Sequence, residues 1–131
     1  MNLAVKGVVI FAIPTGIAVL ISETISMIYV RQRPFVAIPG VKLLVPHGAD
    51  GGMPSHHVVL MTTLIAVVYI YQKRMAFFLT VLMVISGIAR IAAGIHYPTD
   101  VLVAVVLGVG IAYLYRWILL KFINENRLTL D

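Results

Sequence analysis

This sequence has no cysteine and few charged residues. Asp, Glu, Lys and Arg make up 11% of its 131 residues, and only five of these are acidic; an average soluble domain is about 25% charged. The lack of cysteine excludes disulfide bonds, thiol catalysis and thiolate metal sites. The scarcity of charge, beside a hydrophobic content of 61%, excludes both a disordered chain and a water-soluble domain. The sequence is therefore that of a small integral membrane protein.

The net charge of +5 does not indicate a nucleic-acid partner in so apolar a chain. Basic residues are expected here at the ends of membrane spans, beside the headgroups of membrane lipids, or around an anionic substrate.

Four apolar segments are long enough to cross a bilayer, which takes about 20 residues. We predict helices over about 3–30, 55–71, 75–94 and 99–122, with a kink at Pro14. The first segment is longer than the apolar region of a signal peptide and has no clean cleavage site, so we expect it to be retained. We see no repeat or linker. The prediction is an all-α, polytopic membrane bundle of about four transmembrane helices, forming a single domain over residues 1–131.

The basic residues near the span ends predict how the chain crosses the membrane. With four spans, both termini share a side with the turn at Gln72, and that side carries Lys6, Lys73, Arg74, Arg116, Lys121 and Arg127. The opposite side carries Arg31, Arg33, Lys42 and Arg90. This modest bias predicts a multi-pass protein of the cell membrane, with cytoplasmic termini and the long loop of about 31–54 facing outward.

The remaining polar residues gather on that outward side. They include all four histidines and two aspartates: His47, His56, His57, His96, Asp50 and Asp100. Ionisable groups at a membrane span cost free energy and usually mark a function. Interfacial side chains reaching water would account for Arg31, Lys42 and His47 taken singly. They do not account for Arg90, which lies within an apolar helix.

Phosphate chemistry fits this cluster. Arg33 and Arg90 supply forked donors that match phosphate oxygens, and the helix beginning near Ser55 offers free N–H groups to the same anion. One neutral imidazole can attack phosphorus while a second, protonated one donates to the leaving oxygen. Asp100 could orient His96, or it could simply cap the last helix. A metal site at His56 and His57 is the weaker alternative, because adjacent helical side chains point about 100° apart.

Three motifs, taken together, resemble the type 2 phosphatidic acid phosphatase (PAP2) superfamily. The family pattern is Lys-x6-Arg-Pro, then Pro-Ser-Gly-His, then Ser-Arg-x5-His-x3-Asp. The chain has Arg33-Pro34, then Pro54-Ser55-His56-His57, then Ala89-Arg90 followed at the same spacing by His96 and Asp100. The sequence around these motifs is most similar to the bacterial undecaprenyl pyrophosphate phosphatases of the bacitracin-resistance type.

The resemblance implies a role for each matching residue. His96 would be the nucleophile, forming a phosphohistidine; Asp100 would orient it, and His57 would be the general acid. Arg33, Arg90, Ser55 and backbone N–H groups near His56 would hold the phosphoryl oxygens. The family generally needs no metal, so we expect none and no other cofactor. One neutral and one protonated histidine predict a bell-shaped pH profile between about pH 4 and 9.

The chain also departs from the pattern. The family lysine falls at Ser26, where Arg31 could stand in; Ala89 replaces a serine and His56 a glycine. Family members commonly have six spans, so this chain is a minimal form, a truncated piece of a longer protein, or a protomer that completes its bundle as a homo-oligomer. The implied substrate is undecaprenyl diphosphate, whose hydrolysis recycles the carrier lipid for cell-wall synthesis. The alternatives are phosphatidic acid or phosphatidylglycerophosphate as substrate, a non-catalytic lipid-phosphate-binding protein, and a haem or metal carrier.

Overall fold

The computed structural model describes the backbone of residues 8–128 and the side chains of residues 8–122. Its elements, in chain order, are η1 (Val8–Ala12), α2 (Ile13–Ile28), α3 (Pro34–Ala37), α4 (His56–Tyr71), α5 (Lys73–Ala92) and α6 (Pro98–Leu128). This part of the chain contains no strand, which confirms the predicted all-α fold class. The four long helices match the four predicted segments to within a few residues, except that α6 runs on to Leu128. The first predicted residues, Lys6 among them, lie outside the described part.

Among the described residues, three segments are long and apolar enough to cross a membrane: Val8–Ile28, Lys73–Ala92 and Pro98–Phe122. The fourth helix, α4, has 16 residues. At 1.5 Å per residue it is about 24 Å long, which is shorter than a hydrocarbon core of about 30 Å.

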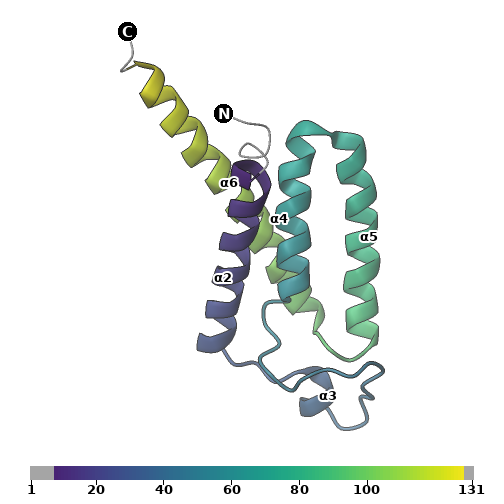
Figure 1. Cartoon of the computed structure of the whole chain (residues 1–131). Helices are drawn as coiled ribbons and strands as arrows, with labels where there is room; N and C mark the ends of the chain where they lie inside the picture. Colours follow the sequence, from purple (N-terminus) through teal and green to yellow (C-terminus); the bar gives the residue numbers. More distant parts are fainter. Residues whose placement is uncertain (1–7, 129–131) are drawn as a thin grey trace.

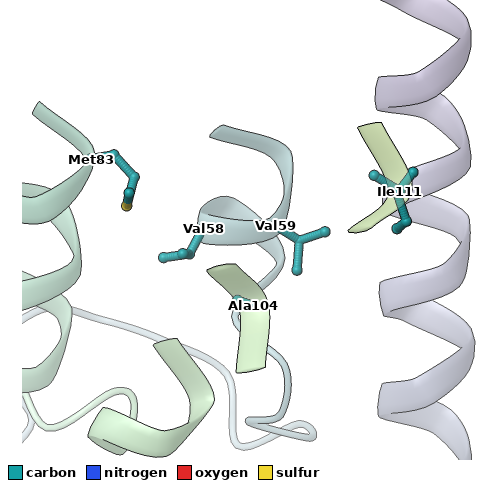
Figure 2. Packing of buried hydrophobic residues seen from close by; sticks show 6 residues of the cluster. Val58, Val59, Met83, Ala104 and Ile111 are labelled. Atoms are coloured by element: carbon teal, nitrogen blue, oxygen red, sulfur yellow. The ribbon is translucent and has the colours of Figure 1, made fainter. Parts of the chain in front are cut away.

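Helix α4 lies at the centre of the bundle, in contact with α2, α5 and α6 (Figure 1). Val58 and Val59, both fully buried, point to opposite sides of it, towards Met83 of α5 and Ile111 of α6 (Figure 2). Because α4 is enclosed by its neighbours and not by lipid, it does not need to match the full thickness of the hydrocarbon core. Its polar first turn can then lie recessed among the other helices.

Gly108 allows α6 to approach α4 closely. A Cβ atom at Gly108 would lie 2.8 Å from the Val59 carbonyl oxygen and 3.0 Å from the Thr63 backbone nitrogen. Thr63 Oγ1 donates to the Val59 and Gly108 carbonyls at 2.8 and 3.3 Å. Gly108 therefore serves packing within this chain.

The predicted kink at Pro14 takes the form of a π-helical turn, η1, immediately before α2. Proline has no N–H group, so the Val9 carbonyl has no donor five residues later in a π-helical pattern. The Tyr115 hydroxyl of α6 donates to that carbonyl at 2.7 Å. The irregular turn is thus fixed against α6.

The outward faces of the long helices are apolar and exposed. On α5, only Ala76, Met83 and Gly87 are buried, and Phe77, Phe78 and Ile88 are each more than 60% exposed. Such faces suit lipid rather than water, so the chain is a multi-pass membrane protein.

Candidate active site

The predicted site residues all lie at one end of the bundle. This end holds α3, the long loop before α4 and the short loop between α5 and α6; the start of η1 and the end of α6 lie at the other (Figure 1). The first turn of α4 is set back from the ends of α2 and α5. This end, which we call the recess, has two cavities. His96, His57, Asp100, Arg33, Arg90, Ser55 and His56 all belong to the loops and helix ends found there.

His96 is the best-defined side chain of the recess. It is 4% exposed, and its Nδ1 lies 2.8 Å from the Gly52 carbonyl oxygen. A carbonyl only accepts, so Nδ1 carries the proton and Nε2 keeps its lone pair. Burial and the charge of Arg33 lower the pKa of His96 to about 4, with smaller contributions from Arg90 and His47, against the raising effect of the Gly52 hydrogen bond. The ring is therefore neutral at physiological pH.

Asp100 lies one turn beyond His96 and is held by other partners. Its Oδ2 accepts from the Tyr97 N–H at 2.8 Å, as a helix-capping carboxylate does, and lies 3.7 Å from His96 Nδ1. Its Oδ1 accepts from Arg31 at 2.8 Å. The direct acceptor for His96 is therefore the Gly52 carbonyl, while Asp100 both caps α6 and places a buried negative charge beside the imidazole.

Arg31 is a partner that the sequence did not identify. Besides Asp100, its Nη1 donates to Thr99 Oγ1 at 2.7 Å, and its guanidinium lies 4.0 Å from the Tyr97 ring centroid. It neutralises a carboxylate that is only 1% exposed. In this structure Arg31 therefore binds residues at the start of α6. Among the described residues it forms no hydrogen bond with Ser26, where the family has its lysine.

Arg33 is 2% exposed and binds the loops around it. Its Nε and Nη2 donate to Asp50 Oδ1 at 3.2 and 3.0 Å, and further bonds reach the carbonyls of Asp50, Gly51 and Ile95. Burial raises the pKa of Asp50, but its hydrogen bond and ion pair with Arg33 outweigh this and lower it overall. Arg33, which is predicted to bind phosphate, is thus already paired with the carboxylate of Asp50.

Two buried polar atoms lack a hydrogen-bond partner where the phosphoryl group was predicted. They are Ser55 Oγ, at the N-cap of α4, and Arg90 Nε. The first backbone N–H groups of α4 have no intrahelical acceptor either, since the Ser55 carbonyl receives its first bond from Val59. An unsatisfied buried donor costs about 1–3 kcal/mol, and a bound oxyanion would satisfy these groups.

The two catalytic candidates line different cavities. His57 and Arg90 line a cavity of about 440 Å³ together with His47, which the sequence alone allowed as a plain interfacial side chain. His96 lines another, of about 460 Å³, with Tyr97 and residues of the loop before α4. The structure therefore brings His57 and Arg90 together, whereas His96 lines a separate cavity.

His56 points away from these cavities. Its Nδ1 lies 2.7 Å from Ser22 Oγ of α2, and Ser22 is fully buried. This bond ties the start of α4 to α2, so that only the backbone of His56 is available at the recess.

Ser26, at the position of the family lysine, packs against the loop before α4. Its Oγ donates to the Gly51 carbonyl at 3.4 Å, and a Cβ atom at Gly51 would lie only 2.7 Å from that Oγ. Within residues 8–122, no three His, Asp or Glu side chains form a group that could hold a metal ion.

The chain matches known proteins along most of its length. The PAP2 superfamily model matches residues 7–124. The chain is 34% identical over 108 residues to undecaprenyl-diphosphatase BcrC of Bacillus subtilis strain 168, covering 82% of the chain and 55% of that protein. It is 31% identical over 111 residues to the bacitracin transport permease protein BcrC of Bacillus licheniformis, covering 83% of the chain and 55% of that protein.

A more distant relative is an undecaprenyl-diphosphatase of Sulfolobus acidocaldarius, 26% identical over 99 residues that cover 75% of the chain and 48% of that protein. The chain thus spans about half the length of the curated relatives it matches. No solved structure matches it.

Proposed function

Because the chain belongs to the PAP2 superfamily, whose model matches residues 7–124, we propose that it is a membrane lipid phosphatase that hydrolyses undecaprenyl diphosphate to undecaprenyl phosphate and inorganic phosphate. The substrate follows the names of the Bacillus and Sulfolobus relatives. The active site faces outward from the cell membrane.

One observation carries this proposal: the hydrogen bond from His96 Nδ1 to the Gly52 carbonyl. It fixes the tautomer in which Nε2 is unprotonated, and the low pKa of His96 keeps the ring neutral. A buried, oriented, neutral imidazole beside unpartnered anion donors is what a nucleophile for phosphorus requires.

In the first step, His96 Nε2 attacks the terminal phosphorus, and the bond from that phosphorus to the bridging oxygen breaks. His57 donates a proton to the bridging oxygen as it leaves. Arg90, Ser55 and the N–H groups at the start of α4 take the equatorial oxygens, whose charge they offset as the bond breaks. Arg33, the other arginine predicted to bind phosphate, adds its positive charge near these oxygens.

In the second step, water attacks the phosphohistidine while His57 accepts its proton, and inorganic phosphate leaves. The phosphorylated imidazole carries positive charge, and Asp100 Oδ2 is 3.7 Å from its Nδ1. Asp100 therefore stabilises the intermediate electrostatically, with the Gly52 carbonyl as the hydrogen-bond acceptor.

The test is phosphate release from undecaprenyl diphosphate by the full chain in detergent, with chelator present. We expect release by the wild type and a loss of at least about a thousandfold in His96→Ala, the scale on which removing a nucleophile acts. Arg74→Ala, an exposed basic residue at the other end of α5, is the matched control and should retain full activity.

Equal release by the wild type and His96→Ala would contradict the nucleophile. Release from phosphatidic acid but not from the diphosphate would replace the substrate. Tight binding of lipid phosphate without turnover would indicate the non-catalytic alternative.

A further inference from the structure

The cavity lined by His57 offers more anion-binding groups than a general acid needs. His47, His57 and Arg90 all line it, and no acidic side chain does so among the described residues. Arg90 also has its Nε buried without a hydrogen-bond partner. The guanidinium and the imidazole N–H groups can all donate to an anion, which would supply the negative partner that the cavity lacks.

His47 reaches this cavity from the loop before α4, outside the three motifs. It is half-buried, and its Nδ1 donates to the Gly48 carbonyl at 3.1 Å, so Nε2 is the nitrogen left for a ligand. The titratable groups that interact with it are His57, His96 and Asp50. Asp50 is already paired with Arg33.

The position of His57 identifies which part of a substrate occupies this cavity. His96 lines a separate cavity, and in the proposed mechanism the nucleophile and the general acid act on opposite sides of the reacting phosphorus. The cavity on the His57 side therefore receives the leaving group. A lipid monophosphate would leave an uncharged alcohol there, whereas a lipid diphosphate would leave a phosphate monoester with at least one negative charge.

We propose that His47, together with Arg90, forms a second anion subsite, in which His47 binds the departing phosphate of a lipid diphosphate and Arg90 bridges that phosphate and the terminal one. This subsite makes the chain select diphosphates over monophosphates. This inference rests on the proposed function and adds His47 as its specificity-determining residue. No new step is required: the bridging oxygen that accepts the proton from His57 stays on the phosphate held by His47 and Arg90.

The kinetic test compares farnesyl diphosphate and farnesyl monophosphate as substrates of the wild type, His47→Ala, His47→Lys and Arg74→Ala. We expect His47→Ala to lower kcat/KM for the diphosphate by about tenfold or more, the scale of a hydrogen bond to a charged group, and to change the monophosphate value less than about twofold. His47→Lys supplies a donor to the anion in place of the imidazole and should recover part of the loss. Equal losses on both substrates, or no loss on either, would overturn the subsite.

A binding measurement separates this inference from the proposed function. Pyrophosphate should raise the thermal unfolding temperature of the detergent-solubilised wild type more than orthophosphate does, and His47→Ala should lose that difference while Arg74→Ala keeps it. If the wild type releases phosphate from neither ester, the proposed function fails, yet the binding result still decides the subsite. An unchanged pyrophosphate effect in His47→Ala would refute it.

Discussion

At the scale of single residues, the recess is organised by backbone carbonyls as much as by side chains. The Gly52 carbonyl fixes the tautomer of His96, and the Ile95, Asp50 and Gly51 carbonyls hold Arg33. A Cβ atom at Gly52 would lie 3.2 Å from Arg33 Cγ, so glycine lets the loop pass close to the arginine. The loop before α4 is therefore part of the site and not merely a connection.

His96 makes the stability of the fold depend on pH. Its pKa is about 4 in the folded chain and about 6.5 in an unfolded one. Below pH 6.5 the unfolded state binds a proton that the folded state does not, so the free energy of unfolding falls as the pH drops from 6.5 to 4. This shift corresponds to about 3 kcal/mol at most. Thermal unfolding in detergent at pH 7 and pH 4.5 measures it.

The matched variant is His96→Asn, whose side chain does not titrate and can still donate to Gly52. It should lose less stability than the wild type between the two pH values; an identical loss in both proteins would contradict the buried neutral ring. The same pKa sets the acid limb of kcat/KM near pH 4, so the predicted bell-shaped profile should be broad on its acid side.

At the scale of elements, α4 and α6 form the closest packed pair, and Gly108 is the point of contact. In Gly108→Ala the added methyl group would meet the backbone of α4, at 2.8 Å from the Val59 carbonyl, and neither helix backbone can turn aside as a side chain could. We expect a loss of about 1–3 kcal/mol in the free energy of unfolding, as for other overpacked contacts. Denaturation followed by circular dichroism in detergent would report it.

Gly110→Ala is the natural comparison, since a Cβ atom at Gly110 meets nothing within 4 Å. Alanine favours a helix over glycine by about 1 kcal/mol, so this variant should be neutral or slightly more stable. If the two substitutions behaved alike, the close approach of α6 to α4 would be wrong.

The sequence predicts these elements well and their contacts poorly, for physical reasons. Long apolar runs define the four helices, and an even number of spans places the motif residues at one end. The one-turn helix α3 has no such signal. The partners of Arg31 and Asp50 depend on the path of a long loop, which no periodicity specifies, and Asp100 satisfies both interpretations of its spacing because it caps α6 and adjoins His96. The PAP2 resemblance was confirmed; the roles of the site residues stay predictions.

At the scale of the whole molecule, the structure changes the weight of the charges used to predict sidedness. Of the four basic residues at the site end, Arg31 and Arg33 are in ion pairs and Arg90 lines a cavity. Lys42 lines the cavity of His96, whereas Lys73, Arg74, Arg116 and Lys121 lie at the other end. The bias towards a cytoplasmic position for that other end is therefore stronger than a plain count of charges gives.

This orientation depends on whether α4, with only 16 residues, carries the chain across the membrane. The absence of cysteine makes a direct test possible, because Ala49→Cys in the long loop and Gln72→Cys in the turn after α4 each introduce a single thiol at an exposed position. In intact cells, a membrane-impermeant maleimide should label Ala49→Cys and should reach Gln72→Cys only after permeabilisation. The reverse pattern would put the site in the cytoplasm. Labelling of both positions in intact cells would mean that α4 does not cross the bilayer, and the recess would then have no outer leaflet from which to take its lipid.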